Sequence, residues 1–171
     1  SRIGFTGDNP QVSELDSIPF PARHLLKTEL YNIGTMRGRK RYTSIMTSRG
    51  CPFSCAFCNT SIYGNRVRRR SVGNVISEIK QIINDFGVEH FYFLDDTLTL
   101  DRNYMLNLCS EIKKNKFKFT WEGSTRANLI DEELVDVLAK SGLIRISLGL
   151  ETADMRVREI IKKVVPLESY I

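Results

Sequence analysis

From residue 43 onwards the hydrophobic pattern alternates between two periods. Short, nearly continuous apolar runs predict strands that are buried on both faces, at 43–47, 88–94, 117–122 and 143–148. Longer segments between them carry apolar residues every third or fourth position, which predicts helices beginning after Ser71, Asp101 and Asp131 and a fourth helix at 153–164. The expected helix ends are Gly87, Gly142 and Pro166.

A strand followed by a helix, four times in succession, predicts an α/β fold. Such units place their strands parallel, with right-handed crossovers. The carboxyl ends of parallel strands meet at one edge of the sheet, where ligands collect. Unusual polar residues follow all four predicted strands: a cysteine-rich loop, the pair Asp95 and Asp96, Arg126, and Glu151. The sequence therefore predicts one site at that edge.

Residues 1–42 have a different pattern. Their prolines, polar residues and weak periodicity predict a linker with one short helix around 22–30. Residues 43–171 form the predicted core domain. The chain lacks an initiator Met and its repeat stops after four units, so we expect it to be a piece of a longer protein.

Composition narrows the classes of protein that fit. A chain of 171 residues is long enough for one domain with a real core, and its net charge of +5 suits anionic ligands without demanding nucleic acid. No apolar run approaches the about 20 residues of a membrane span, and residues 1–10 lack the apolar part of a signal peptide. Four cysteines, three of them clustered, suit a reducing cytoplasm better than a disulfide framework.

The cysteine-rich loop is the strongest chemical signal. The spacing of Cys51, Cys55 and Cys58 allows one loop to place their three thiols around a common centre. Structural zinc and electron-transfer clusters normally take four protein ligands, whereas three thiolates leave one position open. Cys109 lies far away on a helical face with Met105 and Leu108, which predicts a core thiol. The pattern favours a 4Fe-4S cluster with one exchangeable iron; a zinc loop or three unrelated thiols are the alternatives.

The spacing CxxxCxxC, with Phe57 before the last cysteine, resembles the signature of radical S-adenosylmethionine (SAM) enzymes. The resemblance implies a partial (β/α)6 TIM-like barrel, here reduced to about four units. It also implies that the open iron binds the amino and carboxylate groups of SAM. Reductive cleavage would then give methionine and a 5′-deoxyadenosyl radical that abstracts hydrogen from a substrate.

The same resemblance assigns SAM contacts to strand-end residues. Asp95 and Asp96 stand where the family has a motif that binds the SAM amino group, although a capped strand-end turn is the alternative. Arg126 would pair with the SAM carboxylate, and the ribose hydroxyls would meet one of two residues, Ser147 or Glu151. A salt bridge or cap would explain these three equally. Phe57 would pack beside the adenine. No catalytic acid or base is assigned.

The segment 15–23, LDSIPFPAR, resembles the linker of the cobalamin-dependent branch, which includes anaerobic magnesium-protoporphyrin ester cyclases. A generic proline-rich linker is the alternative. The resemblance implies that any cobalamin is held by a domain outside this chain. It further implies methyl transfer or ring formation on a small or medium organic substrate, with a flavodoxin or ferredoxin as the reductase.

Two other functions fit parts of the sequence. A radical SAM tRNA methylthiotransferase would suit the pI of about 9.1 and the basic run at 66–70. That run lacks the interleaved aromatics that stack on bases, so we expect no nucleic-acid partner. A non-catalytic iron–sulfur or zinc scaffold is the third reading.

Overall fold

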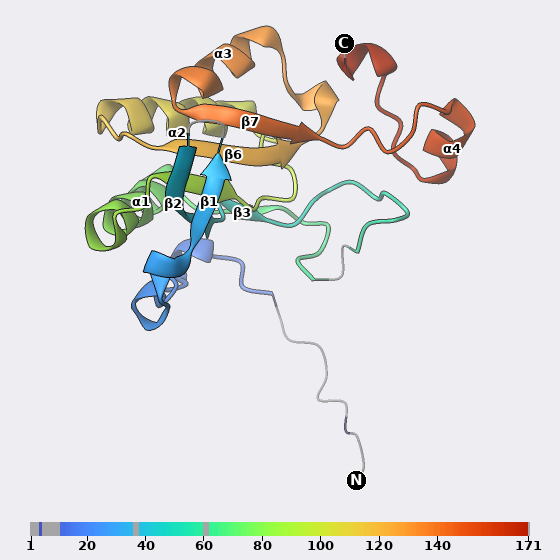
Figure 1. Ribbon diagram of the computed structural model, residues 1–171. Helices are drawn as coiled ribbons and strands as arrows, with labels where there is room; N and C mark the ends of the chain where they lie inside the picture. Colours follow the sequence, from blue (N-terminus) through green and yellow to red (C-terminus); the bar gives the residue numbers. More distant parts are fainter. Residues whose placement is uncertain (1–3, 5–10, 36–37, 60–61, 171) are drawn as a thin grey trace.

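The computed structural model describes residues 4, 11–35, 38–59 and 62–170. Its main sheet has the strand order β1-β2-β5-β6-β7 (Figure 1). The strands are β1 (Asn32–Thr35), β2 (Gly38–Ile45), β5 (His90–Phe93), β6 (Thr120–Thr125) and β7 (Leu143–Leu148). The α-helices are α1 (Val72–Phe86), α2 (Arg102–Lys114), α3 (Glu132–Lys140) and α4 (Met155–Ile160).

Four strands of this sheet are parallel, as the alternating pattern predicts. β2 pairs with β5, β5 with β6 and β6 with β7, all in parallel register. β1 is an additional antiparallel strand at the edge beside β2, which the sequence analysis did not predict. The α/β class is thus confirmed, and the carboxyl ends of β6 and β7 point to the side where the cysteine loop and α4 lie (Figure 1).

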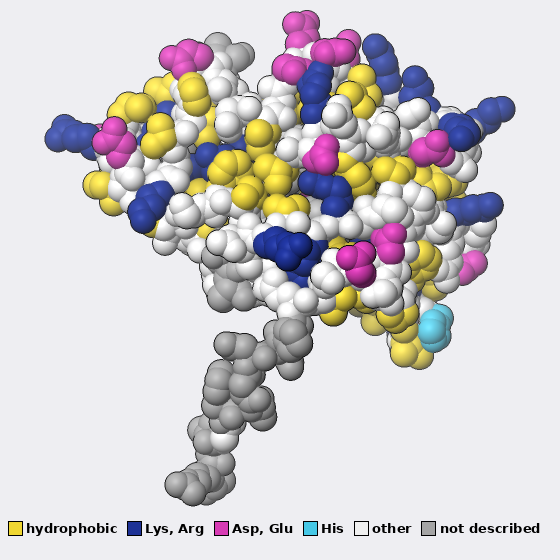
Figure 2. Space-filling model, turned by 180° about the vertical axis from the view of Figure 1, so that it is seen from behind, with side chains coloured by type: hydrophobic (Ala, Val, Ile, Leu, Met, Phe, Trp, Pro, Cys, Tyr) yellow, Lys and Arg dark blue, Asp and Glu magenta, His cyan; other side chains and the backbone are white. Residues whose placement is uncertain are grey.

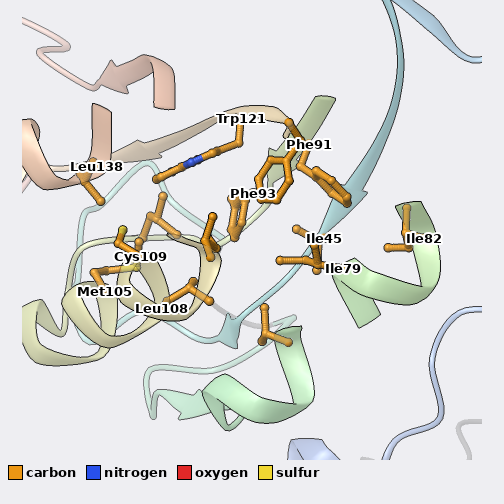
Figure 3. Packing of buried hydrophobic residues seen from close by; sticks show 14 of the residues in the cluster. Ile45, Ile79, Ile82, Phe91, Phe93, Met105, Leu108, Cys109, Trp121 and Leu138 are labelled. Atoms are coloured by element: carbon orange, nitrogen blue, oxygen red, sulfur yellow. The ribbon is translucent and has the colours of Figure 1, made fainter. Parts of the chain in front are cut away.

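One hydrophobic core lies between the sheet and the helices α1, α2 and α3. Trp121 and Phe93 pack with ring centroids 4.9 Å apart (Figure 3). Phe91 meets Phe119 edge-on, with ring centroids 4.8 Å apart. Cys109 is fully buried in the same cluster, which confirms that it is a core thiol. This close packing makes the sheet rigid, and the rigid sheet positions the loops at its edge.

The predicted helix starts are confirmed by their hydrogen bonds. Ser71, Asp101 and Asp131 each accept a hydrogen bond from the backbone N–H three residues ahead. Gly87 ends α1 with a φ of +60°, in the left-handed region that glycine adopts without strain.

Several strand bounds differ from the prediction. β2 ends at Ile45 instead of 47, because the N–H of Thr47 donates to Asp95 and leaves the ladder. β6 starts at Thr120 instead of 117, since Phe117 and Phe119 pack against the core before strand pairing begins. β5 is also shorter than the apolar run that predicted it.

The fourth helix is shorter than 153–164. It ends after Ile160, and Lys162 takes a left-handed φ of +54°. The N–H groups of Lys162 and Lys163 donate to the carbonyls of Glu159 and Arg158, which is a Schellman closure. Pro166 is therefore not the terminator.

The prediction of a short helix at 22–30 is wrong. Two 3-10 turns, Arg23–Leu25 and Thr28–Leu30, take its place. Leu25 and Leu30 are largely exposed, so this segment has no apolar face to bury, and burial of such a face is what stabilises short helices. Residues 1–3, 5–10 and 36–37 of the predicted linker lie outside the described residues, and the division into linker and core stays a prediction.

A two-stranded ribbon, β3 (Ser48–Arg49) with β4 (Arg68–Arg69), brackets the cysteine loop. Within the described part of the chain, no helix is both long and apolar enough to cross a membrane.

Candidate functional site

The cysteine loop and the carboxyl ends of β5, β6 and β7 surround a pocket of about 350 Å³. The cysteine loop lies on the side of the sheet where α4 follows β7 (Figure 1). The lining residues come from the cysteine loop, from these three strand ends and from the turn after α4: Cys51, Phe53, Cys55, Phe57, Cys58, Asp96, Thr97, Ser124, Thr125, Arg126, Ser147, Leu148, Gly149 and Lys163. The predicted convergence of strand-end residues therefore holds for seven of the predicted site residues, Cys51, Cys55, Phe57, Cys58, Asp96, Arg126 and Ser147.

Backbone contacts hold the cysteine loop at its start and near its middle. Gly50 has a φ of +91°, and a Cβ on it would lie 2.5 Å from the carbonyl oxygen of Arg66, so only glycine lets the chain enter the loop here. The N–H of Cys51 donates to Gly64 at 3.3 Å, and the N–H of Ala56 donates to Ile161 at 2.9 Å. The second bond ties the loop to the end of α4.

The three pocket thiols form a donor set suited to a cluster. Partial burial raises the pKa of Cys58, and the nearby thiols of Cys51 and Cys55 raise it further. The Cys58 thiol thus resists ionisation until a cation stabilises its thiolate. Among the described residues, no three Cys, His, Asp or Glu side chains converge as they would on a single metal ion. A cubane cluster is larger than one ion, so its thiolates stand apart around it.

Two side chains from neighbouring strand ends contact the cysteines. The hydroxyl of Thr97 lies 3.3 Å from Cys51 Sγ, and Nη1 of Arg126 donates to Cys55 Sγ at 3.5 Å. The Arg126 guanidinium also stacks over Phe53, with Cζ 3.9 Å from the ring centroid. Nε of Arg126 is buried without a partner in the described part of the chain, which leaves a donor for a ligand.

The two neighbouring aspartates have different positions. Asp95 is only 4% exposed and accepts hydrogen bonds from the Thr47 N–H (3.0 Å), the Thr47 hydroxyl (2.6 Å) and the Ser48 hydroxyl (2.6 Å). Burial raises the pKa of Asp95, and these hydrogen bonds act in the opposite direction. Asp95 thus fastens the end of β2 to the end of β5, whereas Asp96 lines the pocket.

Ser147 and Glu151, both predicted to meet the SAM ribose, also differ. Ser147 pairs with Ser124 in the sheet, and both line the pocket. Glu151 lies outside the lining and accepts a hydrogen bond from Lys163 Nζ at 2.7 Å. Gly149 makes room for this pair, because a Cβ there would lie 2.4 Å from Lys163 Nζ.

Sequence reasoning missed Phe53, Thr97 and Lys163. Lys163 Nζ lies 5.6 Å from the centroid of the Phe57 ring, so it covers the residue expected beside the adenine. Phe53 lies in the cysteine loop and Thr97 follows Asp96, so their positions beside predicted site residues could have identified them. No sequence feature pointed to Lys163, because the turn after α4 brings it to the pocket.

Two arginines of the basic run at 66–70 bond groups inside the fold. Arg68 donates to the carbonyls of Val12 and Tyr63, and Arg70 bonds Glu78 and the carbonyl of Met46. On the face shown in Figure 2, basic and acidic side chains lie among hydrophobic ones instead of forming a band of one charge. Neither observation supports a nucleic-acid surface.

Comparisons with known proteins agree with this geometry. Residues 45–171 match the profile of the radical SAM superfamily. The chain is 34% identical over 169 residues to the cytidylyl-2-hydroxyethylphosphonate methyltransferase of Streptomyces wedmorensis, covering 92% of this chain and 31% of that one. It is 31% identical over 169 residues to the anaerobic magnesium-protoporphyrin IX monomethyl ester cyclase of Rubrivivax gelatinosus, covering 98% and 30%.

A solved structure has the same fold. The radical SAM methyltransferase TsrM from Kitasatospora setae, with cobalamin and a 4Fe-4S cluster bound, superposes with a TM-score of 0.68 at 20% identity. The match covers 77% of this chain and 27% of TsrM. The chain thus spans about a third of the length of the relatives it matches.

Proposed function

The chain belongs to the radical SAM superfamily, and from that membership we propose that it is the core of an enzyme that binds a 4Fe-4S cluster and cleaves SAM reductively to a 5′-deoxyadenosyl radical. The observation that carries the proposal is one pocket lined by Cys51, Cys55 and Cys58 together with polar residues from three further strand ends. Bound there, a reduced cluster would supply the electron that cleaves SAM.

The protein's own residues would hold and orient the ligands. Cys51, Cys55 and Cys58 would ligate three irons as thiolates and leave the fourth iron open. Asp96, which faces the pocket, is the proposed acceptor for the SAM ammonium. Asp95 would act indirectly, because its oxygens already hold Thr47 and Ser48.

The remaining pocket residues would contact the other parts of SAM: its carboxylate, its ribose and its adenine. The unpartnered Nε of Arg126 is the proposed donor to the SAM carboxylate. Ser147 would bond a ribose hydroxyl, and the half-exposed ring of Phe57 would pack beside the adenine. Glu151 would contribute by holding Lys163 at the pocket.

The reaction on the substrate is proposed from the relatives, of whose length this chain spans about a third. Relatives named as methyltransferases and as a ring-forming cyclase support methyl transfer or ring formation on a small or medium organic molecule. Cobalamin, where it is used, would be held by a domain outside this chain. An external reductase, such as a flavodoxin or ferredoxin, would supply electrons, and an oxygen-sensitive cluster suits a reducing cytoplasm.

Anaerobic reconstitution with iron and sulfide tests the proposal. We expect a brown protein that releases 5′-deoxyadenosine when dithionite and SAM are added. Cys55→Ala should abolish both the cluster and the product. Cys109→Ala is the matched control, since that thiol is buried in the core and should leave both unchanged.

Three results would contradict parts of the proposal. Zinc in place of iron, with no broad visible absorption, would favour a scaffold protein. A well-formed cluster without SAM binding would overturn the assignment of the pocket. Release of 5′-deoxyadenosine that persists in Cys55→Ala would show that the product does not come from this cluster.

A further inference from the structure

Arg126 joins the end of β6 to the middle of the cysteine loop. Its side chain is largely buried, with the residue only 9% exposed. Nη1 donates to Cys55 Sγ at 3.5 Å, across 71 residues of sequence, and the guanidinium plane covers the ring of Phe53. One arginine therefore makes two contacts with a loop that has no regular secondary structure between its first and last cysteines.

We propose that Arg126 positions the cysteine loop and sets the reduction potential of the cluster by donating to the Cys55 sulfur. This role rests on the proposed function, because it requires Cys55 to be a cluster ligand. It goes beyond the predicted contact with SAM and acts before SAM binds. Arg126 is then a positioning residue whose effect passes through the sulfur of Cys55.

The direction of the effect follows from charge. Reduction adds an electron to a cluster that already carries thiolate ligands, and hydrogen bonds to the sulfurs favour the reduced form. A guanidinium donor adds a fixed positive charge to the hydrogen bond, which makes it stronger than a neutral one. Because Arg126 is buried, salt screens this charge poorly. Arg126 therefore raises the reduction potential.

Thr97 gives an internal comparison. Its hydroxyl lies 3.3 Å from Cys51 Sγ, so a second ligand has a side-chain partner that carries no charge. Removal of the Thr97 hydroxyl should lower the potential less than removal of the Arg126 charge. Comparison of the Thr97 and Arg126 variants therefore separates the effect of a neutral hydrogen bond to a cysteine sulfur from the effect of a charged hydrogen bond.

The experiment is a redox titration of the reconstituted protein without SAM, followed by electron paramagnetic resonance of the reduced cluster. We expect Arg126→Gln to shift the midpoint to a more negative potential than the wild type. Arg126→Lys, which keeps the charge and loses the planar fork, should shift less, and Thr97→Val should also shift less than Arg126→Gln. Arg102→Gln removes an arginine that pairs with Asp131 and Glu133 away from the pocket, and should leave the midpoint unchanged.

A wild-type midpoint in Arg126→Gln with a full complement of iron would overturn the proposal. Should Arg126→Gln lose iron while Arg126→Lys keeps it, the positioning role is supported, and the midpoint is then read in Arg126→Lys. A wild-type or slightly lower value there supports tuning by the retained charge, and a value above the wild type would overturn the tuning role. A wild-type chain that binds no cluster would overturn the proposed function, and this role with it. Failure in the variant alone concerns only Arg126.

Discussion

Nη1 of Arg23 lies 2.6 Å from Oε1 of Glu78, and both side chains are buried. The contact joins the segment before the sheet to helix α1 across 55 residues of sequence. Arg23 also donates to the carbonyl of Ser44 at 2.9 Å, next to the last residue of β2. Glu78 receives a second cation, Arg70, so one carboxylate holds two arginines in place.

Replacing Glu78 by Ala should destabilise the chain severely. The change leaves Arg23 and Arg70 buried without their counter-charge, which typically costs about 3–5 kcal/mol. Chemical denaturation measures the free energy of unfolding. Asp136→Ala is the control, because its pair with Lys140 is exposed on both sides and should be worth less than about 1 kcal/mol. Similar losses in both variants would contradict the structural role of the buried pair.

Asp95→Asn and Asp96→Asn should separate stability from ligand binding. An amide at Asp95 cannot accept all three hydrogen bonds from Thr47 and Ser48, so we expect a loss of about 1–3 kcal/mol in unfolding free energy. An amide at Asp96 should leave stability unchanged and weaken SAM binding by the reconstituted protein, measured by equilibrium dialysis. The reverse result would reassign the two aspartates.

Because His90 is buried, we expect the free energy of unfolding to fall in mild acid. It is buried on β5, with Nδ1 2.9 Å from the Thr120 hydroxyl. Burial lowers the pKa of His90, and Glu122 acts in the opposite direction. The folded chain therefore binds this proton less tightly than the unfolded chain. The stability contributed by neutral His90 is present above a pH of about 6.5 and is lost as the pH falls below it.

Denaturation at pH 7.5 and pH 5.5 measures that loss. Wild type should lose more unfolding free energy between these values than His90→Asn, which has no group that titrates there. Groups that do not contact His90 contribute equally to both proteins, so the difference reports His90 together with its neighbour Glu122. An equal loss in both would show that His90 is not the source.

Two glycines should respond to alanine in opposite directions. Gly142 has a φ of +108°, and a Cβ there would lie 2.5 Å from the carbonyl oxygen of Phe119, so Gly142→Ala should cost about 1–3 kcal/mol or more. Gly73 lies in the first turn of α1, and apart from its chain neighbours and the nearby backbone of its own helix no atom lies within 4 Å of an added Cβ. Gly73→Ala should stabilise the chain by about 0.4–1 kcal/mol. Thermal or urea unfolding of both variants checks the signs.

The sequence alone determined the order and type of the main elements and the identity of the cluster motif. Hydrophobic periodicity reports which side of a local segment is buried, and capping residues such as Ser71 and Asp131 act within one helical turn. The resemblance carried by the cysteine spacing is confirmed by the family match. These signals are local, so they can be read without knowing the fold.

Tertiary structure decided what each polar residue does. Asp95 and Asp96 are neighbours of the same type, and only their surroundings distinguish them. Asp95 is buried and accepts hydrogen bonds that join two strand ends, whereas Asp96 lines the pocket. Arg126 meets Cys55, and Lys163 reaches Phe57, because the sheet brings distant strand ends together. A hydrogen bond or ion pair depends on a few ångströms and on burial, and a linear pattern specifies neither.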